Sequence, residues 1–464
     1  MAEVLLRVFL RWSCRAALVA SLLGSTHGWA QPTVDPSIPL AERLFPALVP
    51  LLEKAVEQSP RAINSNLEFL IAQENIGQQR ARLLPSVGGY MTYSYTQDRR
   101  LDREDPLYGA KLMYNMSLTQ PLYHWGALKA GHQYAKLTAK IAENNHAETC
   151  RLLVLEVRAA YLRLVVSKAN VKRADEALRL VRAEVQHVET QLKAGLMSRA
   201  DLDGPVLRSQ YAELDRDRAH EDYRLAKMTV ERLTGSEALS DESIPDHVPK
   251  IVFPRERLAA LSDHFDAAAP GSGIYRLEVA RLRVEQEKLN YAILDKNLRP
   301  KFNFVTGVSQ DEVGYTGSPA DKARTQSFFG GININWAVFD GFSTSAQRRA
   351  SRLRIRQLKA EQTDREREQD ELVKNQVRQL EFSARGAALS EHTLDQANEM
   401  VRSKENDVRL GLAAEGEIEG VKLSRDATQI QTMAVRNDLL GRIAEFISSV
   451  GRDPALQAFP PSPP

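Results

Sequence analysis

The sequence predicts a mainly α-helical protein that carries four β-strands and is built as a tandem duplication. Three observations indicate this fold class. Landmarks recur about 216 residues apart, each copy passes from a two-residue to a seven-residue apolar period, and the heptad stretches are far longer than an ordinary helix. By length alone the 464 residues would suggest three compact domains, so the duplication changes the expected architecture.

The N-terminal segment has the three parts of a secretory signal peptide. Arginines precede the apolar run of residues 16–23, and Gly28 and Ala30 supply the small residues of a cleavage site. An uncleaved membrane anchor is the alternative, which the shortness of the apolar run disfavours. Because Cys14 precedes that run, we expect no lipoprotein cysteine. Removal of residues 1–30 takes away three arginines and one glutamate, so the 62 basic and 60 acidic residues become 59 of each. This balance disfavours a nucleic-acid partner.

The duplication is visible as short motifs that return in the same order. Pro85 recurs as Pro300, Gly195 as Gly411, and Gly235 as Gly451. We expect five segments: a signal peptide over 1–30, a first repeat over 31–235, a connector over 236–271, a second repeat over 272–451 and a proline-rich tail over 452–464.

Each repeat contains two stretches in which apolar and polar residues alternate, the pattern of a strand with one apolar face. Polar loops are expected at 97–106 and 309–325, between the strands of each hairpin. About ten residues per strand fits a transmembrane strand, and a soluble sheet with one wet face is the local alternative. The alternation places four residues on the polar face, which would line a barrel lumen or be an ordinary solvated face: Lys111, Asn115, Asn333 and Asn335.

Long helices follow the hairpins. Residues 128–192 contain no proline, and their apolar residues repeat every seven positions, as at Val157, Leu164 and Leu178. Sustained heptads indicate coiled-coil packing, and about 68 residues at 1.5 Å each give a helix of roughly 100 Å. The second copy repeats this seam.

Shorter helices are expected to pack along the long ones. Return helices over about 199–234 and 417–450 can cover only half of each long helix, so helices over 40–84 and 272–298 would cover the other half. Four strands cannot close a barrel, and a bilayer does not tolerate open sheet edges. The chain is therefore expected to form a symmetric homo-oligomer that encloses a lumen.

The order of these features resembles the TolC-like outer-membrane efflux proteins. A helix ending at Leu84-Pro85, a hairpin closing on residues 120–123, a heptad helix, a turn at Gly195 and a return helix occur in this order and then occur again. The resemblance covers residues 40–451. It implies a homotrimer in which twelve strands form an outer-membrane barrel, continued by a periplasmic α-helical barrel.

The same resemblance implies a function and partners. The chain would be the passive exit duct of a tripartite efflux pump or type I secretion system. Its partners would be further copies of itself, a periplasmic adaptor protein, an inner-membrane pump of the RND or ABC type, and outer-membrane lipid. No cofactor is implied.

The resemblance also assigns the two helical turns to the periplasmic tips, where the channel is gated and adaptors dock. The docking turns would include Gly195, Leu196, Ser198, Gly411 and Leu412. The acids Asp201 and Glu417 follow these turns, with Glu415 and Glu419 beside the latter, and would form the gate. Asp201 has a structural alternative, because Ser198 and Asp201 have capping-box spacing.

Two positions depart from the family's pattern. Ala413 stands where some members carry a gate-locking arginine, so Arg199 or Arg409 are the nearest substitutes, and Gly420 stands where some carry a second acid.

Remaining candidates have weaker signals. Trp125 and Trp336 lie near strand ends, where aromatic rings favour the membrane interface or pack at the strand–helix junction. His124, His132 and His146 lack metal-ligand spacing, so we expect surface residues and no metal site.

Two other classes of function explain less of the sequence. A soluble periplasmic coiled-coil adaptor or scaffold would explain the heptads but not the duplicated strands. An enzyme is disfavoured because the sequence has no phosphate-binding loop, nucleophile elbow or His-Glu-x-x-His motif.

Overall fold

The computed structural model describes residues 38–98, 107–236, 239–263, 265, 274–314, 322–412 and 415–455. All of them belong to one structural unit, residues 36–464. The predicted signal peptide, Ala413 and the end of the predicted tail lie outside the described residues. None of the described helices combines the length and the apolarity needed to cross a bilayer.

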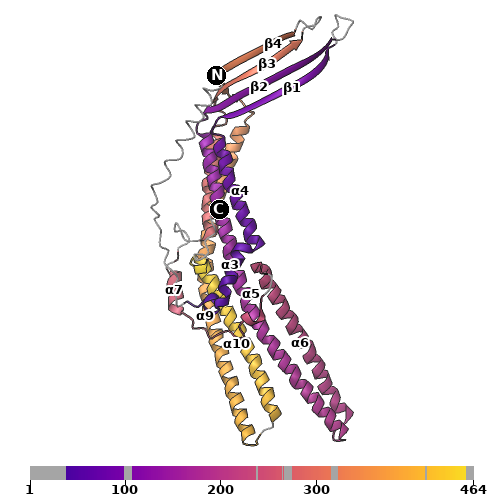
Figure 1. Ribbon diagram of the computed structural model, residues 1–464. Coiled ribbons are helices and arrows are strands. Elements are labelled where there is room, and N and C mark those ends of the chain that lie inside the picture. Colours follow the sequence, from indigo (N-terminus) through magenta and orange to yellow (C-terminus); the bar gives the residue numbers. More distant parts are fainter. Residues whose placement is uncertain are drawn as a thin grey trace, which may run out of the picture. The chain divides into compact units, whose positions relative to one another are not determined.

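Two long helical hairpins dominate the structure (Figure 1). Each contains a 67-residue helix and a shorter antiparallel one: α5 (Ala127–Lys193) with α6 (Arg199–Thr234), and α9 (Ser343–Arg409) with α10 (Glu415–Ser449). The predicted heptad seam is confirmed, since Val157, Leu164 and Leu178 are buried in α5 and Val373 and Leu380 are buried in α9.

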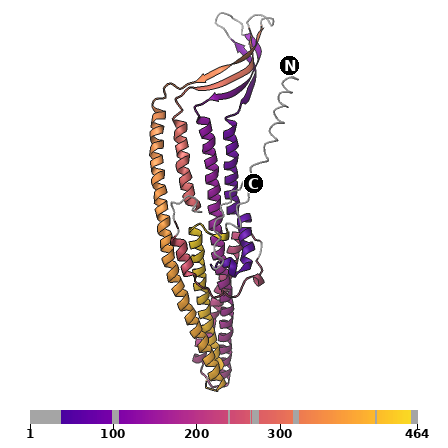
Figure 2. The same ribbon diagram turned by 90° about the vertical axis from the view of Figure 1, so that its left-hand side faces the viewer.

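The halves of α5 and α9 nearer the sheet pack against α4 (Pro60–Ala81) and α8 (Tyr275–Leu294). Figure 2 shows α4, α5, α8 and α9 in a row, each neighbour in contact with the next. Near the sheet this row is a single layer, and the described residues leave its two sides uncovered there.

The predicted helix over residues 40–84 is wrong as one continuous element. The chain there forms α2 (Ala41–Leu44), the 3-10 helix η1 (Pro46–Leu48), α3 (Val49–Gln58) and then α4. Proline has no N–H to continue a helix and is accepted only in the first turn. Accordingly Pro46 opens η1, and Pro60 opens α4 after the extended residue Ser59.

A hydrophobic core forms where α3, α5, α6 and α10 meet. Fully buried side chains from these helices include Leu52, Leu153, Val230 and Met433. The connector contributes the short elements η2 (Asp241–Ser243) and α7 (Arg255–Asp263), and its residue Val248 is buried in the same core. The middle of α5 is thus fixed to α6 and α10, so this core joins the two hairpins.

The strands form one antiparallel sheet in the order β1-β2-β3-β4. Their bounds are β1 (Ser86–Asp98), β2 (Leu107–Tyr123), β3 (Lys301–Gly314) and β4 (Lys322–Asn335). The β2–β3 pairing joins the two repeats. The outer edges of β1 and β4 have no partner strand in the described sheet, so the sheet does not close within one chain.

The strands are longer than predicted. The predicted loop over 309–325 is wrong at both ends, because β3 continues to Gly314 and β4 starts at Lys322. Polar residues pair across these strands here: Gln326 donates to Gln310 at 3.0 Å, and Arg324 lies 3.7 Å from Glu312. The polar residues that predicted a loop therefore belong to the paired ends of β3 and β4.

The backbone repeats along with the sequence. Gly195 and Gly411, at the two hairpin turns, both have φ of +73°. Only glycine adopts this left-handed conformation without steric cost. The sheet-to-helix junctions also match, since Trp125-Gly126 and Gly341-Phe342 both have positive φ, 216 residues apart in sequence.

Candidate functional site at the hairpin ends and in the sheet

The turn between α5 and α6 is held by a capping box. The Ser198 backbone N–H and hydroxyl donate to the same Asp201 carboxylate oxygen at 2.8 and 2.7 Å. These hydrogen bonds hold the pKa of Asp201 below its ordinary value. Asp201 therefore does what its spacing from Ser198 suggested: it stabilises the start of α6.

The second hairpin is held by ion pairs near its turn. Lys404 of α9 lies 2.6 Å from Glu417 of α10, and Lys422 lies 3.2 Å from Glu405. The hydrogen bond with Glu417 raises the pKa of Lys404. Glu417 is thus paired within its own hairpin, whereas the side chain of Glu415 lies outside the described residues.

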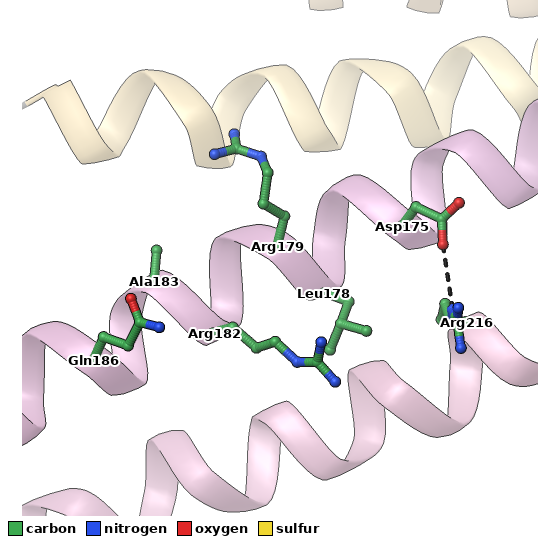
Figure 3. A pocket seen from close by; sticks show the side chains of 7 residues that line it. All are labelled: Asp175, Leu178, Arg179, Arg182, Ala183, Gln186 and Arg216. Atoms are coloured by element: carbon green, nitrogen blue, oxygen red, sulfur yellow. Dashed lines mark hydrogen bonds and ion pairs between the residues drawn. The ribbon is translucent and has the colours of Figure 1, made fainter.

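One ion pair connects the two hairpins. Arg179 of α5 lies 2.6 Å from Glu176 and 3.6 Å from Glu419 of α10. Figure 3 shows Arg179 pointing toward α10, away from α6. Sequence reasoning missed Arg179 and Lys404, although Arg179 directly follows the seam residue Leu178, a position from which a side chain can reach a neighbouring helix.

A groove of about 490 Å³ lies beside this connection. Its lining residues come from α5 and α6: Asp175, Leu178, Arg179, Arg182, Ala183, Gln186 and Arg216. Arg182 pairs with Glu213 at 3.1 Å. Arg216 pairs with Asp175 at 3.4 Å (Figure 3), and both pairs lie within the first hairpin. The arginines of the groove are therefore already neutralised by acids.

Arg199 and Arg409 are the expected substitutes for the missing lock. Arg199 and Arg409 are exposed, and neither forms an ion pair with any residue in the described part of the chain. The two turns instead present apolar side chains to solvent. Leu196 is 76% exposed and Leu412, its counterpart in the second repeat, is 75% exposed.

The strand register places the four candidate lumen residues on one face of the sheet. Lys111 lies opposite Ser94, Asn115 opposite Tyr90, Asn333 opposite Asn303, and Asn335 opposite Lys301. The other face carries the apolar set Val87, Met91, Tyr93, Tyr114, Met116, Leu118, Phe302, Phe304, Val308, Phe328, Ile332 and Ile334. An apolar and a polar face are what a membrane-embedded barrel wall requires.

Both tryptophans are fixed at the junction of sheet and helices. The Trp125 indole N–H donates to the Pro300 carbonyl at 2.8 Å, and the Trp336 indole N–H donates to the Leu298 carbonyl at 3.0 Å. Both rings thus hold the same turn, which precedes β3. Packing at the junction and a place at the membrane interface are compatible for both residues.

One expectation about the histidines is wrong. His146 is only 5% exposed, and its ring shares a 2.7 Å hydrogen bond with the Ser65 hydroxyl. Burial lowers the pKa of His146 and raises the pKa of its neighbour Cys150 to about 11. Both groups are therefore neutral constituents of the α4–α5 interface at neutral pH.

Comparison with known proteins agrees with this architecture. Residues 51–236 and 275–452 match the family described as outer membrane efflux protein. The two matched segments fall on the two repeats. The comparison with curated proteins gives no match.

Solved structures with this fold are distant in sequence. The CmeC outer membrane channel of Campylobacter jejuni is 11% identical, with a TM-score of 0.69 over 92% of this chain and 90% of that one. VceC of Vibrio cholerae is 16% identical, with a TM-score of 0.63 over 88% and 97%. The open state of MtrE of Neisseria gonorrhoeae is 14% identical, with a TM-score of 0.63 over 91% and 95%. These likenesses show the fold.

Proposed function

The chain belongs to the outer membrane efflux protein family, and we propose that it is the exit duct of a three-part export system, with an adaptor protein and an inner-membrane pump as partners. The family consists of outer-membrane channels, so it supports the export duct over the alternative of a soluble periplasmic scaffold. One observation carries the proposal: a four-stranded sheet with an apolar face and two unpaired edges. Such a sheet is stable in a bilayer only after copies close it.

Three copies supply the twelve strands that the proposed barrel needs, with Lys111, Asn115, Asn333 and Asn335 facing its lumen. The test is fractionation of the full-length protein, followed by its native mass and its conductance in a planar bilayer. A trimer in the outer-membrane fraction that conducts ions is the expected result. A soluble monomer would overturn the proposal.

The gate of this duct is proposed to lie at the hairpin ends. Arg179 and Glu419 connect the hairpins across 3.6 Å, and both side chains are about half exposed (57% and 50%). An exposed pair contributes at most about 1 kcal/mol, so its loss shifts an open–closed equilibrium by up to about fivefold per protomer. Three protomers that open together multiply this effect.

The gate is tested by single-channel recording of Arg179→Ala. The open fraction should rise, because the ion pair favours hairpins held side by side. Arg182→Ala is the matched control, since Arg182 pairs with Glu213 inside the same hairpin. Equal behaviour of the two variants would remove Arg179 from the gate.

The acids at the second turn are proposed to bind cations at the tunnel mouth. Replacing Glu415, Glu417 and Glu419 by glutamine should weaken the block of single-channel current by divalent cations, because it removes three carboxylates from each protomer. An unchanged block would place these acids outside the conduction path.

The docking of the adaptor is proposed to use the two turns. Leu196 and Leu412 are apolar and exposed at equivalent positions, and neither is needed for burial within the chain. Leu196→Ser and Leu412→Ser should reduce crosslinking to the adaptor while leaving conductance unchanged. Retained crosslinking would refute this docking site.

A further inference from the structure

A cluster of three cations lies at the junction of the helices with the sheet. Lys296, Arg299 and Arg348 surround the carboxylate of Asp295 at distances of 2.7, 3.9 and 3.5 Å. We call these three cations the basic cluster. Hydrogen bonding from Lys296 lowers the pKa of Asp295, which keeps the acid charged. Three positive charges against one negative charge leave a local excess of two.

The surroundings of the basic cluster are also cationic. The chain close to the sheet, over residues 79–85, 124–136, 292–301 and 336–352, contains ten lysines and arginines and two acids. They are Arg80, Arg82, Lys129, Lys136, Lys296, Arg299, Lys301, Arg348, Arg349 and Arg352, against Asp295 and Asp340. The whole chain has nearly equal numbers of each, so the excess here is local.

The basic cluster lies at the level of the interfacial aromatic rings. The Arg299 guanidinium lies over the Trp125 ring, 5.0 Å from its centroid, and the Trp125 ring contacts Tyr123 at 4.9 Å. Tyr123 pairs with Phe302, which belongs to the apolar face of the sheet. Arg299 therefore lies on the side of the sheet that faces lipid, where the hydrocarbon ends and the headgroups begin.

The fold does not require these charges. In the first repeat the positions equivalent to Lys296 and Arg299 are Ala81 and Leu84. The same backbone hydrogen bond closes the turn in both repeats, from Leu84 N–H to the Ala81 carbonyl at 3.0 Å and from Arg299 N–H to the Lys296 carbonyl at 3.1 Å. In the first repeat Arg80 stands at the position of Asp295, so the arrangement of three cations around one carboxylate belongs to the second repeat, and a ligand explains it better than packing does.

We propose that the basic cluster, framed by Trp125, binds the phosphate-containing headgroup of an anionic phospholipid in the periplasmic leaflet of the outer membrane. Basic groups at a membrane surface attract anionic headgroups, and Arg also forms paired hydrogen bonds with phosphate oxygens. The side chains of Lys296, Arg299 and Arg348 are 26%, 44% and 37% exposed, so a headgroup can reach them. The proposal rests on the outer-membrane position of the sheet and not on the gate.

Native mass spectrometry of the detergent-solubilised full-length protein tests this proposal. The protein is titrated with phosphatidylglycerol, with zwitterionic phosphatidylethanolamine, and with soluble glycerol 3-phosphate. Phosphatidylglycerol should bind more tightly than either of the others. Each basic group near an anionic lipid contributes about fivefold, so Arg299→Gln with Arg348→Gln should weaken phosphatidylglycerol binding by about thirtyfold.

Two further variants serve as controls. Arg349→Gln with Arg354→Gln removes the same number of charges from the neighbouring turns of α9, and these arginines bond to Ser345 and Gln357 and not to Asp295. Arg299→Lys with Arg348→Lys keeps the charge and should retain most of the lipid affinity. If the glutamine variant does not assemble, the site is still tested by the lipid affinity of the lysine variant and by the preference of the unmutated protein for phosphatidylglycerol over phosphatidylethanolamine.

Three results would overturn the proposal. They are equal binding of the two lipids, equal loss of lipid in the Arg349/Arg354 control, and glycerol 3-phosphate binding as tight as the lipid, which would indicate a site for a free anion. Oligomer mass and conductance are recorded in parallel. If these are lost in every protein, the unmutated one included, the channel proposal fails and not the lipid site.

Discussion

Arg158 of α5 is the most consequential buried charge in the structure. Its side chain is 2% exposed and donates to both oxygens of Glu42 at 3.0 and 2.6 Å and to both oxygens of Asp453 at 2.7 and 2.8 Å. Burial opposes the charged form of Arg158, but the hydrogen bonds and charges of Asp453 and Glu42 outweigh it and raise its pKa. One guanidinium thus ties the segments before α3 and after α10 to the middle of α5.

We expect Arg158→Met to destabilise these terminal segments by about 3–5 kcal/mol. The variant leaves two carboxylates without their cation, and Asp453 is only 1% exposed. Breaking one side of a buried ion pair costs this much, whereas replacing all its members by neutral groups is often close to neutral. The triple change Arg158→Met, Glu42→Gln and Asp453→Asn should therefore recover most of the loss.

The measurement is native-state hydrogen exchange of the amides in residues 41–58 and 449–455, where local opening is read directly. The expected loss corresponds to an exchange rate faster by two to four orders of magnitude, at about 1.4 kcal/mol per tenfold. Arg61→Met is the matched control, because Arg61 pairs with Glu156 on the same stretch of α5 but is 53% exposed. It should cost at most about 1 kcal/mol. If Arg158→Met costs no more than Arg61→Met, the reasoning about burial is refuted.

Three further outcomes follow from the described contacts. Because burial lowers the pKa of His146 below the ordinary 6.5, the unfolded chain binds a proton that the folded chain rejects. Stability should therefore fall as the pH drops below about 6.5, and His146→Gln should flatten this dependence in thermal melts from pH 8 to 5. Gly195→Ala should lose about 1 kcal/mol because φ is +73° there, whereas Gly77→Ala, inside α4 with open space around it, should gain about 0.5–1 kcal/mol in the same melts. Leu380→Ala should cost about 2–5 kcal/mol of unfolding free energy, and Leu389→Ala on the exposed side of α9 about 0.5 kcal/mol or less.

The periodic features of the fold could be predicted from the sequence. The heptad seam and the duplication predicted α5, α6 and α10 to within a few residues, and the repeated seam predicted α9 without its bounds, because packing at a and d positions selects the apolar period directly. A single helix over 40–84 is wrong because Pro46 and Pro60 each start a new element, as proline is accepted only in the first turn of a helix. The loop predicted over 309–325 is wrong at both ends because the polar residues there pair across β3 and β4, and in sequence such polar residues resemble a loop.

Less of the candidate site could be predicted. The turns and the polar face of the sheet followed from local pattern, and so did the capping box of Ser198 and Asp201. The ion pairs of Arg179 with Glu419 and of Lys404 with Glu417 depend on which helix lies beside which, and no local spacing contains that information. His146 was misjudged for a similar reason: its burial is caused by α4, and its partner Ser65 lies 81 residues away.

The position of the core indicates how the hairpins could move. Asn437 of α10 donates to the carbonyl of the buried core residue Leu162 of α5 at 2.7 Å, and the Arg179–Glu419 ion pair lies about 26 Å farther along the helix. The turn at Gly195 lies about 50 Å from Leu162. A tilt of about 10° at the core would therefore displace the turn by roughly 9 Å. The tightly packed core resists distortion, so it acts as a pivot, whereas an exposed pair worth at most about 1 kcal/mol is a weak hold beyond it. Because the core is strong and the Arg179–Glu419 pair is weak, the hairpin ends of a duct can separate while the helices stay packed at the core.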